Sequence, residues 1–147
     1  MKTKIKHCKS LLNTLNWFPP FLARLSLGIV FAESGWGKLH NLERVTDYFT
    51  SLNIPFASIQ APFVAGLEFF GGLLLIFGLA TRLVSVPLIV VMTVAIITAK
   101  LPELNSPSDL FGFSEYLYLV LLFSLTINGP GRISLDQNIS KKMKEDI

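Results

Sequence analysis

The chain has 147 residues, about one domain's worth, with a formal net charge of +3. Only 16% of its residues are charged and the mean hydropathy is +0.54, which favours a polytopic membrane protein over a water-soluble domain. The absence of a basic stripe interleaved with aromatic residues argues against nucleic-acid binding, and the single cysteine, Cys8, excludes an intrachain disulfide or a CxxC redox pair.

Residues 1–18 carry four lysines ahead of the first apolar run, and no small-residue cleavage site follows a short apolar core. This pattern predicts a basic cytoplasmic tail rather than a signal peptide. Residues 19–39, opened by two prolines, form the first predicted membrane span, although Arg24, Glu33 and Lys38 lie within it or at its end. Residues 40–61 are mixed and amphipathic, and we expect a short helix lying on the surface.

The second predicted span, residues 62–82, has the length that an α-helix needs to cross a bilayer. Its interior charge is Glu68, and a carboxylate at such depth needs a partner, a proton or a function. Residues 83–99 form an uncharged third span, 101–108 a turn-rich loop, and 110–128 a fourth span that stops at a Gly-Pro-Gly sequence. Residues 137–147 form a polar cytoplasmic tail. The expected architecture is therefore an all-α bundle of four transmembrane helices within residues 19–136.

Four spans put both chain termini on one side of the membrane. Ten lysines and arginines then lie on or near the inner side, against three on the outer side, which are Lys38, Arg44 and Lys100. This positive-inside asymmetry predicts that both termini are cytoplasmic.

Residue counts along the predicted spans place most of the polar groups within the spans in the outer half of the membrane. Glu33 and Glu68 fall at similar depth, while Lys100 and Glu115 lie at the outer ends of the third and fourth spans. The glycine stripes of the first two spans are expected to face each other, which places Lys38 near Glu68. Glu33 lies away from that stripe, and Lys100 is its expected partner.

Simpler interpretations compete with a functional one. Lys38, Lys100 and Glu115 are close enough to the interface to snorkel, Arg24 suits an anchor at the inner headgroups, and the glycines suit helix packing. Glu33 and Glu68 are harder to explain as surface groups, so proton or quinone handling is favoured over a structural ion pair. The two histidines, His7 and His40, do not allow bis-histidine haem ligation within the bundle, and no nucleotide-binding motif occurs. Electrons for any redox chemistry must then come from a partner or a diffusible carrier.

These motifs together resemble the DoxX family of small bacterial four-helix membrane proteins, over roughly residues 22–136. The resemblance rests on the ordered motifs RLSLG at 24–28, GWGKL at 35–39, GLEFFGG at 66–72, GLATR at 78–82, and GPGRISLD at 129–136, with Glu115 between the last two. Positions that match the family's recurring polar residues are Arg24, Lys38, Glu68, Arg82, Glu115, Arg132 and Asp136. Glu33 does not match, because the family has an apolar or small residue there.

The resemblance implies an inner-membrane oxidoreductase role, since named family members are associated with a terminal quinol oxidase and with membrane-associated oxidoreductase complexes. We expect an accessory subunit of a quinone-linked complex, with Glu68, Lys38 and Glu33 in proton transfer and Glu68, Lys38, Lys100 and Glu115 around a quinone headgroup. No redox cofactor or metal is expected within the chain itself. The alternatives are a non-enzymatic scaffold that docks a protein partner, or a small proton-coupled permease, and a homo-oligomer is compatible with each.

Overall fold

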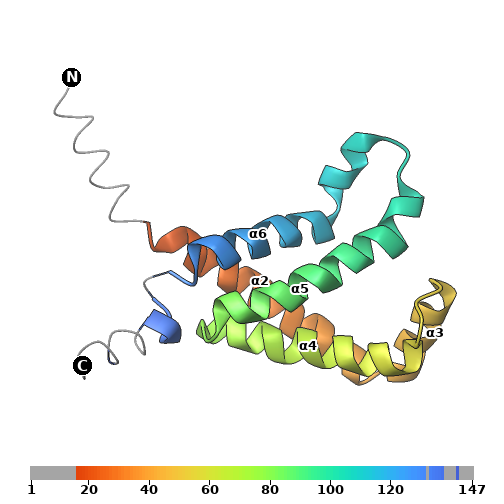
Figure 1. The fold of residues 1–147 in the computed structure, drawn as a ribbon, viewed down its shortest axis with the longest axis horizontal. Coiled ribbons are helices and arrows are strands. Elements are labelled where there is room, and N and C mark those ends of the chain that lie inside the picture. Colours follow the sequence, from red (N-terminus) through yellow and green to blue (C-terminus); the bar gives the residue numbers. More distant parts are fainter. Residues whose placement is uncertain (1–15, 132, 138–141, 143–147) are drawn as a thin grey trace.

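The computed structural model describes residues 16–131, 133–137 and 142 of the chain. Every regular element within these residues is helical, which confirms the all-α prediction (Figure 1). The predicted tails, 1–18 and 137–147, lie almost entirely outside the described residues, as does Arg132.

Helix α2, Phe18–Leu39, agrees with the first predicted span and packs along most of helix α4, Ala57–Phe77. Glycines permit this close approach. A Cβ atom on Gly28 would lie 2.8 Å from the carbonyl oxygen of Gly72, and one on Gly72 would lie 2.7 Å from the carbonyl oxygen of Gly28. Both distances are shorter than carbon and oxygen tolerate, so the predicted glycine contact between the two helices is confirmed.

Helix α3, Leu42–Ser51, is the short amphipathic helix expected between the first two spans. It projects at one end of the molecule and packs against α4 (Figure 1). None of its residues is buried, so it covers the end of the molecule without contributing to the core. Two non-glycine residues with positive φ, Asn53 and Phe56, connect it to α4.

The predicted limits of the second span, 62–82, are wrong at both ends. Helix α4 begins at Ala57, and it ends at Phe77 because Gly78 adopts the left-handed conformation, with φ +66°. The N–H groups of Gly78 and Leu79 then bond to carbonyl groups in the last turn of α4. Arg82 therefore belongs to the next helix, α5, Thr81–Ala95.

Beyond Ala95 the helical path continues through a π-helical turn, η1, Ile96–Lys100, and a 3-10 turn, η2, Leu101–Glu103. The predicted loop is thus partly helical, and a second 3-10 turn, η3, spans Pro107–Gly112. Helix α6, Ser114–Asn128, starts later than the predicted fourth span because residues 110–112 belong to η3.

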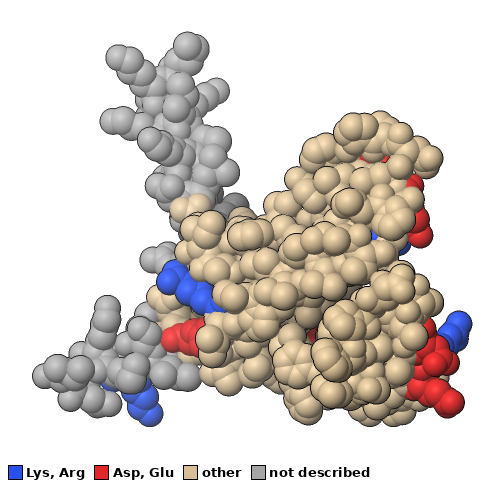
Figure 2. All heavy atoms as spheres, turned by 45° about the vertical axis from the view of Figure 1, so that its right-hand side comes forward, with Lys and Arg blue, Asp and Glu red and all other residues tan. Residues whose placement is uncertain are grey.

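One buried apolar core joins α2, α4, α5 and α6; its members are Leu27, Phe31, Leu75, Val84, Leu88, Met92, Leu122 and Leu125. Much of the exterior is also apolar, and Figure 2 shows a broad uncharged face with charged side chains gathered toward its ends. Two helical stretches, Ala57–Phe77 and Thr81–Glu103, are long and apolar enough to cross a membrane, and Ser114–Asn128 is a shorter apolar helix. The count of four spans and their orientation remain predictions.

Candidate functional site

Lys38 of α2 and Glu68 of α4 form an ion pair between the two glycine-packed helices. The Lys38 Nζ atom lies 2.6 Å from Oε1 and 2.5 Å from Oε2 of Glu68, which confirms the pair expected from helical phase. The side chain of Glu68 is 1% exposed and that of Lys38 is 30% exposed. The carboxylate is therefore enclosed, and the lysine is the more exposed member of the pair.

Ser34 is a third member of this cluster, which the sequence analysis missed. Its hydroxyl donates a hydrogen bond of 2.9 Å to Oε2 of Glu68. Ser34 and Lys38 are four residues apart on α2, so their side chains lie on the same face one turn apart. That spacing was the signal that could have predicted the contact. With three donated hydrogen bonds, the Glu68 carboxylate is held in one orientation.

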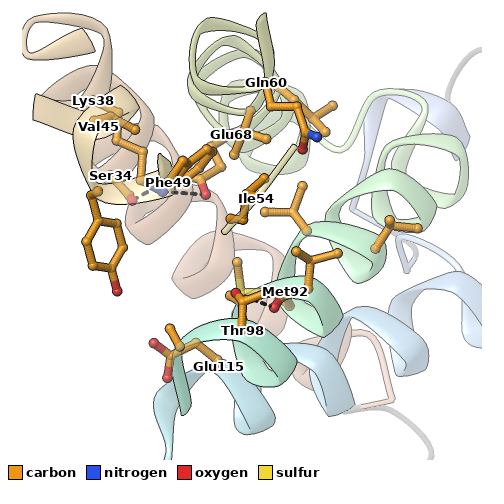
Figure 3. Close-up of a pocket in the computed structure, with 18 of the residues that line it drawn as sticks. Ser34, Lys38, Val45, Phe49, Ile54, Gln60, Glu68, Met92, Thr98 and Glu115 are labelled. Carbon is orange, nitrogen blue, oxygen red and sulfur yellow. Dashed lines mark hydrogen bonds and ion pairs between the residues drawn. The ribbon is translucent and has the colours of Figure 1, made fainter. Parts of the chain in front are cut away.

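The pair borders a cavity of about 610 Å³ that α2, α3, α4, α5 and α6 all help to line. Most of the wall is apolar, and α3 and α5 contribute Val45, Phe49 and Met92 to it. Figure 3 shows Ser34, Lys38 and Glu68 together at one side of the cavity, and Thr98 and Glu115 at another. A mostly apolar space of this size with a few fixed polar groups is typical of a small-molecule site.

The cavity brings Glu68, Lys38, Lys100 and Glu115 to one site, as the sequence analysis expected. Further polar side chains, which that analysis did not single out, also line it; they are Arg44, Tyr48, Gln60, Thr98 and Tyr118. Thr98 and Lys100 lie in the π-helical turn η1, and such turns occur frequently at functional sites.

Glu33 does not join this site. It is exposed on α2 and is not among the residues that line the cavity. Lys100, its expected partner, lies instead 3.6 Å from Glu103, one turn further along its own segment. Glu33 and Glu68 also differ in burial, because Glu68 lies on the face of α4 that packs on α2, whereas Glu33 lies on the exposed side of α2.

Arg24 lies in the protein interior, which corrects the expectation that it anchors at inner headgroups. It is 2% exposed, and its Nη2 donates a 2.5 Å hydrogen bond to the carbonyl oxygen of Ile133. The guanidinium group fills the space beside Gly78, where a Cβ atom would overlap it. Asp136 accepts hydrogen bonds from the backbone N–H groups of Ala80 (2.7 Å) and Thr81 (3.0 Å). These contacts tie residues 133–136 to the corner between α4 and α5.

Among residues 16–131, 133–137 and 142, no group of three His, Cys, Asp or Glu side chains is placed to hold a metal ion. The side chains of the described site can themselves take part in hydrogen bonding and proton transfer. The ammonium group of Lys38 can donate a hydrogen bond or a proton to an oxygen atom in the cavity. The Glu68 carboxylate, fixed by Ser34, holds that ammonium group in place at the edge of the cavity.

The DoxX family model matches residues 20–101, more than half of the chain. The chain belongs to the DoxX family. The matched region contains α2 from Pro20 onward and all of α3, α4 and α5, and with them Ser34, Lys38 and Glu68.

Three DoxX relatives align with most of the chain. It is 36% identical to "Putative oxidoreductase CatD" of Bacillus subtilis over 125 residues, which cover 84% of this chain and 88% of the relative. It is 29% identical to the inner membrane protein YqjF of Escherichia coli over 131 residues, which cover 82% of this chain and 92% of the relative. An uncharacterized membrane protein of Mycobacterium tuberculosis is 33% identical over 132 residues, which cover 81% of this chain and 80% of the relative. No solved structure matches the chain. This DoxX protein is accordingly a membrane protein.

Proposed function

We propose that this DoxX protein is a subunit of a quinone-linked oxidoreductase of the bacterial inner membrane, with four spans and both termini in the cytoplasm. Its cavity binds the quinone headgroup, and the Lys38–Glu68 pair exchanges protons with it. The observation that carries the proposal is an ion pair with an enclosed carboxylate, which borders a large, mostly apolar cavity. The printed name of the B. subtilis relative, an oxidoreductase, supports the same class of function.

The exposure of the pair indicates which group meets the headgroup. Because Glu68 is enclosed and already accepts three hydrogen bonds, Lys38 is the group that contacts a quinone oxygen. When a partner protein supplies two electrons, the oxygen becomes basic and takes a proton from the Lys38 ammonium. Glu68 favours the return of a proton to the neutral amine, and water at the polar side of the cavity supplies that proton and the second one that the quinol requires.

Substitutions of the pair test the proposal in the parent complex. Glu68→Gln keeps the shape of the side chain but removes its charge, so it should lower both quinone retention and the rate at which the complex reduces quinone. Ser34→Ala serves as a milder control, because it removes one hydrogen bond and leaves the ion pair. Unchanged retention and turnover in Glu68→Gln would show that the pair has no part in quinone chemistry.

A second candidate function is a non-enzymatic scaffold that docks a redox partner. The observation that favours it is the set of three hydrogen bonds on Glu68, which suits a clamp between α2 and α4. A scaffold should co-purify with a constant protein partner and no quinone. Its partner binding should survive any substitution of the pair that leaves the fold stable.

A further inference from the structure

A second hollow lies on the outside of α4 and α5, next to the proposed headgroup cavity. It is a groove of about 440 Å³ without a charged residue in its lining, and Phe63, Gly66, Leu67, Phe70, Leu83 and Pro87 are among its lining residues. Phe63, Phe70 and Leu83 are 68%, 62% and 76% exposed. The groove therefore faces the surroundings of the helices, which are lipid if α4 and α5 span the membrane as proposed.

The groove and the headgroup cavity are adjacent. Phe63, Leu67 and Pro87 line both of them, so these three residues are the boundary between the two spaces. Phe63 is largely exposed, and its side chain can change rotamer without leaving a well-packed core. A molecule can thus occupy both spaces by passing between α4 and α5 at Phe63.

Gly66 keeps the groove open. A Cβ atom at Gly66 would meet no other atom within 4 Å, in contrast to Gly28 and Gly72, whose Cβ atoms would collide with the backbone of the facing helix. Helix packing therefore does not require glycine at position 66. What the missing side chain provides is free space in the groove.

We infer that the ligand is a membrane-dissolved quinone that carries an apolar isoprenoid chain, with its headgroup beside Lys38 and the start of its chain in the α4–α5 groove. This inference rests on the proposed function and names the class of quinone. A water-soluble aromatic ligand would leave the groove empty. An apolar chain gains little hydrophobic free energy on moving from lipid to the groove, so the groove acts by giving the chain room while the headgroup is bound.

Filling the groove tests the inference on the full chain in lipid nanodiscs. The probes are menadione, a naphthoquinone headgroup without a chain, and a menaquinone with an isoprenoid chain. Gly66→Leu should weaken binding of the menaquinone at least about tenfold and leave menadione binding unchanged, because the added side chain occupies the space of the isoprenoid chain. Leu83→Trp fills the groove from α5 and should act in the same direction.

Gly37→Leu is the matched control, since a Cβ atom at Gly37 also meets nothing and Gly37 does not line the groove or the cavity. It should leave both probes unaffected. Equal losses for the two probes in Gly66→Leu, or unchanged menaquinone binding in both groove variants, would overturn the inference. The proposed function fails separately if wild type does not bind menadione, or if Lys38→Met binds it equally well.

Discussion

Removing Lys38 alone should destabilise the protein more than removing the charge of Glu68. In Lys38→Met the enclosed carboxylate keeps Ser34 as its remaining side-chain donor. Loss of one partner from a buried ion pair costs about 3–5 kcal/mol, and we expect about 3 kcal/mol here because the carboxylate can take up a proton. In Glu68→Gln the 30% exposed lysine can turn toward polar surroundings, so the expected cost is about 1–2 kcal/mol.

The double variant Lys38→Met/Glu68→Leu removes both charges and keeps apolar volume between the helices. Replacing a buried pair in this way is often neutral, so its stability should lie within about 1 kcal/mol of wild type. The assay is reversible unfolding in mixed detergent micelles, followed by far-UV circular dichroism. The reasoning is refuted if Lys38→Met costs no more than Glu68→Gln, or if the double variant loses the sum of the two single costs.

Four further outcomes follow from the contacts described above. Ser34→Ala should lower the free energy of unfolding by about 1.5 kcal/mol, the value of a hydrogen bond to a charged group, and no loss in the same assay would show that the bond is not formed. Gly72→Leu should prevent close packing of α2 and α4 and lower stability by about 3 kcal/mol or more, whereas Gly37→Leu should not; equal thermal midpoints would contradict the packing. Asp136→Ala removes the acceptor of two backbone N–H groups at the start of α5, so the free energy of unfolding should fall by about 1–2 kcal/mol; an unchanged value would show that these hydrogen bonds do not stabilise the fold. Cys8, the single cysteine of the chain, should react with a membrane-impermeant maleimide only after spheroplasts are permeabilised; labelling of intact spheroplasts would place the N-terminus outside.

The Lys38–Glu68 contact was predictable because it depends on regular helix geometry. Gly28 and Gly35 share a face of α2 with Lys38, and that face packs on the glycine-containing face of α4. Once the two faces meet, the reach of a lysine side chain brings its ammonium to the carboxylate. Such an argument needs only the helical period, so modest errors in helix limits did not harm it.

Helix limits were harder to predict, because they depend on single backbone conformations. Gly78 reads as one more small residue in an apolar run, yet its left-handed conformation ends α4. Pro62 suggested a helix start, while the structure accommodates it within the second turn. Together these shifted the limits of α4 toward the N-terminus, while Glu33 and Glu68 stay at a similar level of the bundle, since Ser34 bonds to Glu68.

The roles of Arg24 and Glu33 depend on tertiary contacts that periodicity does not contain. Arg24 is buried because residues 133–136, over a hundred positions later in the chain, fold back and offer it the carbonyl oxygen of Ile133. Glu33 is only one residue before Ser34, but that step turns it by about 100° and out of the cavity wall. The cavity itself arises where five helices pack together, so it cannot be predicted from the sequence of any single segment.

The central claim is that the cavity beside Lys38 and Glu68 holds a quinone. Mass spectrometry of small molecules extracted from the protein, purified from its native membrane in mild detergent, tests this most directly. We expect a quinone in near-stoichiometric amount with wild type, and little or none with the Lys38→Met/Glu68→Leu variant, whose fold should be intact. Equal amounts in the two preparations, or no quinone in wild type, would contradict the claim.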